Sequence, residues 1–164
     1  TIYNLVGFQT HLTWGEQKRV FSMIPALKNA EFVRYGVMHR NTYLQSPGCL
    51  DRHYRLIAEP RITFAGQITG VEGYMESTAS GLVAAVSLAR ALNGRPEPDF
   101  TDRTILGALA RHVCTPTANF QPMNANFGIL QSLPYRVKGK KNRYEKLSEV
   151  AIDALNEVIK AYEL

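Results

Sequence analysis

The chain has 164 residues, of which 45% are apolar and 20% are charged, and its formal net charge is +5. This composition is typical of a globular protein with one substantial core and excludes a disordered chain. No apolar run approaches the roughly 18 residues of a membrane span, and no signal-like segment is present, so we expect a cytoplasmic protein. Two cysteines without C-x-x-C spacing and four histidines without short ligand spacing predict no disulfide framework and no metal site.

The first predicted element is a helix that begins at a capping box formed by Thr13 and Glu16. Apolar residues then recur at helical spacing until Pro25 interrupts them. Residues 31–44 are predicted to be extended because aromatic and β-branched residues are frequent there. Residues 45–60 are predicted to be a loop with one short strand, and this stretch is the expected crossing between two domains.

A short apolar strand, a glycine-rich turn and a long helix are predicted between residues 62 and 94. The strand is expected at residues 62–65, and three glycines follow it within eight residues: Gly66, Gly70 and Gly73. Glycines let backbone come close to a partner, and the helix that begins near Tyr74 directs its unpaired N–H groups to the same place. An electron-rich ring oxygen or a phosphate would suit that spot. An ordinary strand, turn and helix with structural glycines has the same spacing.

Small residues recur every fourth position along this helix and form one narrow stripe, made of Gly73, Ser77, Gly81, Ala85 and Ala89. The stripe predicts that the helix lies unusually close to a sheet. Asn93 and Gly94 are expected to end the helix.

Two more helices are predicted in the last third of the chain. Thr101 is expected to cap the first, and apolar residues repeated at helical spacing between 144 and 162 indicate the second. Just before the last helix, a segment with one acid holds six basic residues: Arg136, Lys138, Lys140, Lys141, Arg143 and Lys146. This basic segment suits phosphate backbones, although a solvated loop that keeps the protein soluble has the same composition.

Several polar or aromatic side chains are candidates for a ligand pocket: Trp14, His39, Asn41, Gln121, Asn124 and Asn126. The tryptophan either anchors a core or stacks on a pteridine or flavin ring. His39 and Asn41 either reach a ligand from the end of an extended segment or satisfy loop backbone. The three amides lie among apolar residues and need either internal partners or the edge of a heterocycle.

Four segments together resemble a known family of enzymes. Residues 66–76, GQITGVEGYME, are similar to the flavin motif of the GidA-related flavoproteins that modify tRNA. Residues 3–21, 34–41 and 120–128 resemble the TrmFO branch, the folate- and FAD-dependent tRNA (uracil-5-)-methyltransferases. The resemblance covers nearly the whole chain and is weakest over residues 45–60 and 131–164.

The resemblance implies an α/β fold, namely the C-terminal part of a Rossmann-like FAD-binding domain plus the end of an inserted α/β domain. Residues 1–58 would complete the inserted, substrate-facing domain, and residues 59–164 would return to the FAD-binding domain with C-terminal helices. The G-x-G-x-x-G turn of such enzymes does not occur here, and neither Cys49 nor Cys114 matches their catalytic cysteines. We therefore predict no catalytic residue in this chain and expect an N-terminal part of the same protein as its partner.

The implied parent enzyme uses reduced FAD and 5,10-methylenetetrahydrofolate to methylate C5 of a T-loop uridine in tRNA, with NAD(P)H as reductant. The implied flavin contacts are Gly66, Gln67, Ile68, Thr69, Gly70, Gly73 and Tyr74, and the basic segment would bind tRNA. Two alternatives are a non-catalytic RNA-binding or structural fragment without flavin, and a GidA-like tRNA-modifying flavoprotein. Residues 120–128 argue against the second alternative, because they resemble the folate-dependent branch.

Overall fold

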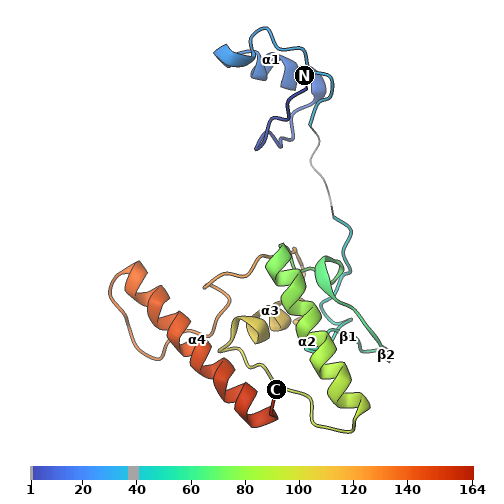
Figure 1. The fold of residues 1–164 in the computed structure, drawn as a ribbon, viewed down its shortest axis with the longest axis vertical. Helices are drawn as coiled ribbons and strands as arrows, with labels where there is room; N and C mark the ends of the chain where they lie inside the picture. Colours follow the sequence, from blue (N-terminus) through green and yellow to red (C-terminus); the bar gives the residue numbers. More distant parts are fainter. Residues whose placement is uncertain (1, 37–40) are drawn as a thin grey trace. The chain divides into compact units, whose positions relative to one another are not determined.

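The computed structural model describes residues 2–36 and 41–164, which form two compact units (Figure 1). The first unit comprises residues 1–40 and the second residues 41–164. The units thus divide before residues 45–60, where the sequence placed the domain crossing. The assignment of 1–58 to an inserted domain and of 59–164 to an FAD-binding domain stays a prediction.

The first unit contains helix α1, Trp14–Phe21, and the short 3-10 helix η1, Pro25–Leu27. The predicted capping box is wrong, because the Thr13 side chain makes no capping hydrogen bond and Glu16 pairs with Arg19 at 2.6 Å. The apolar helix pattern ends at Phe21, ahead of Pro25. Residues 31–36 and 41–44 contain no helix or strand, so extended structure is not confirmed in the described part of that segment.

A buried amide holds the first unit together. The Gln17 side chain is 1% exposed, and its Nε2 donates to the carbonyl oxygens of Leu12 at 2.9 Å and Gly36 at 2.8 Å. Gly36 N–H donates in return to Oε1 of Gln17 at 3.1 Å. Among the described residues, every fully buried apolar side chain belongs to the second unit. The first unit therefore relies on this amide and on a cluster of aromatic rings that includes Phe8 and Phe21, whose centroids are 5.1 Å apart.

The second unit contains a small sheet and three long helices. The elements are β1 (Arg55–Leu56), β2 (Glu59–Thr63), η2 (Gly66–Thr69), α2 (Tyr74–Leu92), α3 (Ile105–Cys114) and α4 (Lys140–Tyr162). The two strands pair antiparallel with an irregular register, and β2 ends at Thr63, earlier than the predicted strand. The core joins the helices to the residues before the sheet, with Leu50, Val83, Leu109 and Val158 all buried. This mixture of helices and sheet agrees with the α/β class, while the Rossmann-like assignment stays a prediction.

Helix α2 confirms the predicted helix but not its predicted packing face. The residues it buries are Ser80, Val83, Ala84 and Ser87. A Cβ atom at Gly81 would meet nothing within 4 Å, and Ala85 and Ala89 are exposed. The predicted stripe of small residues is therefore not the packed face, because turning Val83 inward removes more apolar area from water than turning glycine and alanine inward.

Helix α3 is capped by Thr104 and not by Thr101. Thr104 Oγ1 accepts a hydrogen bond from Gly107 N–H at 3.0 Å and donates to the Phe100 carbonyl at 2.5 Å. Thr101 instead has a φ of 53° in the turn that precedes the helix. Helix α4 begins at Lys140, so the basic segment extends into the first turns of this helix and does not end before it.

None of the helices in the described ranges combines the length and apolar character that a bilayer crossing needs.

Candidate functional site

The glycine-rich turn positions the open end of α2. Gly66, Gly70 and Gly73 have φ values of 77°, 90° and 111°, which L-residues with side chains rarely adopt. Inside the turn, Gly66 N–H donates to Ser80 Oγ at 2.8 Å, and Thr69 Oγ1 donates to the Gly66 carbonyl at 2.8 Å. The turn is therefore shaped by left-handed glycines and fixed to α2 by a buried serine.

The close approach at Gly70 is made by a side chain of the same chain. A Cβ atom at Gly70 would lie 2.5 Å from Cε1 of Phe120, whose side chain is 4% exposed. The ring of Phe120 also packs on Tyr43, with centroids 6.0 Å apart, and on His112 at 5.4 Å. At this glycine, the missing side chain makes room for a core aromatic.

The segment 120–126 runs along the turn, so the structure joins two motifs that lie about fifty residues apart. Met123 N–H donates to the Gly70 carbonyl at 3.2 Å, and Glu72 N–H donates to the Met123 carbonyl at 3.0 Å. Asn124 Nδ2 donates to the Glu72 carbonyl at 2.8 Å. A parallel bridge between Val71 and Met123 completes this contact.

The predicted amides of this segment have different environments. Asn124 contacts the turn, whereas Asn126 closes its own loop by accepting from Gly128 N–H at 2.9 Å and donating to the Asn124 carbonyl at 3.1 Å. Gln121 is exposed, and its carbonyl oxygen lies 3.1 Å from His112 Nε2. Asn124 and Asn126 thus have internal partners, and contact of any of the three with a ligand stays a prediction.

The N-terminal end of α2 has the geometry that an electron-rich atom requires. Gly73 provides no side-chain cap, and hydrogen bonding within the helix starts with Ser77 N–H, which donates to the Gly73 carbonyl at 3.0 Å. Tyr74 and Met75 are 95% and 79% exposed, so the first helical turn faces solvent on their side, while the Glu76 carboxylate and the Asn124 amide lie over Gly73. The Glu76 carboxylate lies in the same turn and accepts from Ala125 N–H at 2.9 Å. A neutral ring oxygen therefore suits this end better than a phosphate, which the carboxylate would repel.

The other predicted pocket residues are separated between the units. Trp14 belongs to the first unit, and its side chain is 63% exposed, so it does not anchor a core there. Asn41 is an exposed residue of the second unit. His39 lies outside the described residues. A ligand role for these three stays a prediction.

A cavity of about 650 Å³ lies between residues 127–137 and the first turns of α4. One wall is a stacked pair of rings, Phe127 and Tyr144, with centroids 4.6 Å apart and planes at 16°. Of the six residues in the basic segment, three line the cavity: Arg136, Lys140 and Arg143. We call this site the basic-aromatic cavity. Its ring pair was not predicted, since the partners are separated by a loop.

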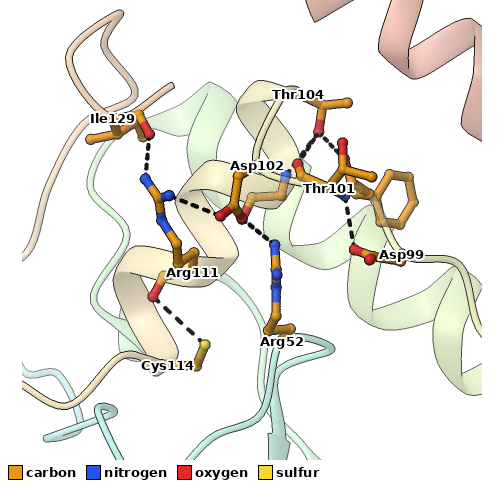
Figure 2. A network of polar contacts seen from close by, with 10 residues as sticks. Arg52, Asp99, Thr101, Asp102, Thr104, Arg111, Cys114 and Ile129 are labelled. Carbon is orange, nitrogen blue, oxygen red and sulfur yellow. Dashed lines mark hydrogen bonds and ion pairs between the residues drawn. The ribbon is translucent and has the colours of Figure 1, made fainter. Parts of the chain in front are cut away.

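A partly buried network of charged side chains holds the start of the loop that lines this cavity (Figure 2). Asp102 accepts from Arg52 and, at 2.8 Å, from Arg111, whose second nitrogen donates to the Ile129 carbonyl at 2.7 Å. Gln131 N–H donates to the Asp102 carbonyl at 3.1 Å. The sequence gives no local signal of this network, because its residues lie far apart in the chain.

The two cysteines differ in environment. Burial raises the pKa of the Cys114 thiol, and its Sγ lies 3.6 Å from the Arg111 carbonyl. A nucleophilic cysteine needs a lowered pKa, whereas burial acts on Cys114 in the opposite direction; that this chain holds no catalytic residue stays a prediction. Cys49 is exposed.

We expect iodoacetamide at mildly alkaline pH to alkylate Cys49 several times faster than Cys114, because only the thiolate reacts and only Cys49 is freely accessible. Peptide mass spectrometry over a time course measures both rates in one sample. Denaturant should make the two rates similar. Equal rates in the folded chain would contradict the assigned environment of Cys114.

Known proteins with similar sequences identify the family of this chain. The family model described as glucose inhibited division protein A, GIDA, matches residues 1–96. The chain is 55% identical over 161 residues to the methylenetetrahydrofolate--tRNA-(uracil-5-)-methyltransferase TrmFO of Streptococcus pneumoniae strain Taiwan19F-14. Proteins of the same name from strains 70585 and TIGR4 of this species are equally similar. Each match covers 97% of this chain and 36% of the relative, so the chain spans about a third of the length of these curated relatives. Because the family model matches more than half of its residues, this chain belongs to the GIDA family.

Proposed function

We propose that the chain works as part of a flavoprotein tRNA methyltransferase. The enzyme would transfer a one-carbon unit from 5,10-methylenetetrahydrofolate to C5 of a T-loop uridine in tRNA, using reduced FAD. The observation that carries this proposal is the contact between the glycine-rich turn and residues 120–126 at the open end of α2. The turn resembles the flavin motif of the GidA-related flavoproteins, residues 120–128 resemble the folate-dependent branch, and the two motifs form one local structure. NAD(P)H as reductant and a cytoplasmic location complete the proposal.

The residues at the turn would divide the work of holding the cofactor. The N–H groups of Tyr74 and Met75 would donate to an electron-rich ring oxygen. Ile68, 37% exposed, offers an apolar surface on the glycine-rich turn. Thr69 is fully buried and bonds to Gly66, so its side chain would position the turn and not touch the cofactor. Gly70 would act in the same indirect way, since Phe120 covers it.

When bound, reduced FAD would supply the electrons that convert the transferred carbon to a methyl group. The chain itself would orient that cofactor and, through the basic segment, hold the phosphates of tRNA. No residue of this chain is assigned to proton transfer or nucleophilic attack. In this proposal the catalytic groups belong to another part of the enzyme, which agrees with the environment of Cys114.

A chimaera tests the proposal. The 161 matched residues of the Streptococcus pneumoniae relative would be replaced by the corresponding residues of this chain. We expect a yellow protein with flavin absorption bands that methylates uridine in unmodified tRNA when supplied with the folate and NAD(P)H. The unaltered relative is the control for the assay, and circular dichroism confirms that the chimaera folds. A folded but colourless and inactive chimaera would refute the proposed function.

A further inference from the structure

We propose that the basic-aromatic cavity binds one unpaired nucleotide of RNA, with the base against the aromatic wall and the phosphate at the cationic rim. The inference rests on the proposed tRNA substrate and assigns a specific role to this cavity. Its volume, about 650 Å³, lies within the range of small-ligand pockets.

The wall has the surface that a base needs. Phe127 and Tyr144 are stacked, with planes at 16°, and Phe127 remains 37% exposed. Tyr135 also lines the cavity, and its side chain is 52% exposed. Exposed aromatic faces stack on bases whatever their sequence, because every base has a π face. Leu130, Leu133 and Leu147 add apolar surface to the lining of the cavity.

The rim has the charge that a phosphate needs. Arg136, Lys140 and Arg143 line the cavity, and no Asp or Glu is among its described lining residues. Lys140 Nζ and Arg143 Cζ lie 5.5 Å and 5.4 Å from the centroid of the Tyr144 ring, so charge and stacking surface adjoin. The first turn of α4 contains no acidic residue. The positive end of the α4 dipole adds to the charge of these side chains, so an anion is favoured at this rim.

Two neighbouring lysines of the basic segment have acidic partners and lie outside the cavity lining. Lys146 pairs with Glu149 at 2.7 Å and Lys141 with Glu145 at 3.9 Å, both along the exposed surface of α4. Neither lysine lines the cavity. The basic segment thus contains cavity cations and paired surface cations of the same type, which serve as matched controls for one another.

An unpaired nucleotide fits these features better than the other anionic ligands. A duplex hides its base faces, so it could use the rim but not the aromatic wall. Inorganic phosphate could likewise use only the rim. Because Arg111 and Asp102 hold Ile129 and Gln131, the wall is already fixed, and binding would cost little ordering of the loop.

The test measures binding of labelled RNA to the full chain by fluorescence anisotropy. The probes are single-stranded oligouridylate and a duplex RNA with the same number of phosphates, and inorganic phosphate serves as competitor. We expect the single strand to bind more tightly than the duplex. Tyr135→Ala should lower the affinity for the single strand by about 5- to 100-fold. The affinity for the duplex and the salt dependence of binding should stay unchanged. Tyr135→Phe should restore the affinity, because stacking needs the ring and not the hydroxyl group.

The controls separate this cavity from general charge. Lys140→Ala should lower the affinity for both RNA probes and reduce the slope of log affinity against log salt concentration by up to about one unit. Lys141→Ala should change this slope less. Tyr3→Ala removes a tyrosine that is 82% exposed in the first unit and should leave binding unchanged. If circular dichroism shows that Tyr135→Ala is unfolded, two other comparisons decide whether the cavity binds a nucleotide. These are the RNA affinity of Lys140→Ala against that of Lys141→Ala, and the affinity of the unaltered chain for the single strand against that for the duplex.

Two results would overturn the inference: equal affinity for single strand and duplex, or unchanged single-strand affinity in folded Tyr135→Ala. The proposed function would still stand if the chimaera methylates tRNA. An inactive chimaera, together with the expected variant effects on oligouridylate, would refute the methyltransferase role and retain the nucleotide site. Displacement of oligouridylate by millimolar inorganic phosphate alone, with no effect of Tyr135→Ala, would reduce the cavity to an anion site and overturn the inference.

Discussion

Gly70→Ala should lower the free energy of unfolding of the second unit by about 2–5 kcal/mol. About 1–2 kcal/mol comes from placing a side chain at a φ of 90°, and about 1–3 kcal/mol from displacing the Phe120 ring, which a Cβ atom would approach to 2.5 Å. Urea denaturation followed by circular dichroism measures the loss. In the chimaera, the same substitution should also reduce the flavin content, because the Phe120 ring supports the turn that carries the end of α2.

Gly48→Ala is the matched control for this prediction. Gly48 has a φ of 79°, but a Cβ atom there would meet nothing within 4 Å. We expect it to cost only the backbone contribution of about 1–2 kcal/mol and to leave the flavin content unchanged. Equal losses for Gly48→Ala and Gly70→Ala would show that the Phe120 ring moves aside freely, contrary to the packing described.

Gly107→Ala should destabilise the second unit by more than about 3 kcal/mol. A Cβ atom at Gly107 would lie 2.6 Å from the Thr101 carbonyl carbon and 2.8 Å from that of Phe100. These are backbone atoms, so no side-chain rotation relieves the clash. The turn at residues 100–104 is also held in place, because its Thr104 caps α3 and its Asp102 pairs with Arg52 and Arg111. Thermal and urea unfolding of the variant measure the effect.

Gly81→Ala should have the opposite sign. Gly81 lies in the interior of α2 with open space around its Cα, and its φ is not in the left-handed region. Alanine has the higher helix propensity, so we expect stabilisation by up to about 1 kcal/mol. Gly81→Ala and Gly107→Ala thus each place a methyl group on a helical glycine of the second unit. A Gly107→Ala protein as stable as the wild type would contradict the packing of α3 against residues 100–101.

The sequence by itself determined the elements that depend on neighbours close in the chain. Helix α4 was predicted because apolar residues recur every three or four positions. Helix α2 was predicted because it follows a glycine-rich turn and repeats small residues every fourth position, and Asn93 and Gly94 ended it as expected. The glycine-rich turn was found because few residues other than glycine adopt a positive φ. The family was recognised from motifs that are each continuous in sequence, and the GIDA match agrees with that recognition.

The candidate site was predictable in its parts and not in its assembly. Residues 66–74 and 120–128 were each identified, but the sequence did not show that Phe120 fills the space above Gly70 or that Met123 pairs with Val71. The basic segment was identified, but not which of its cations line a cavity.

The tertiary structure alone decided which of several equivalent local patterns is used. Gly73, Ser77 and Gly81 form as regular a stripe as the face that α2 buries, and Thr101 is as good a capping residue as Thr104. The choice depends on which arrangement buries more apolar area and satisfies more polar groups across the whole unit. The contacts that make this choice, such as those of Asp102 with Arg52 and Arg111, join residues distant in the chain, and no short-range pattern encodes them.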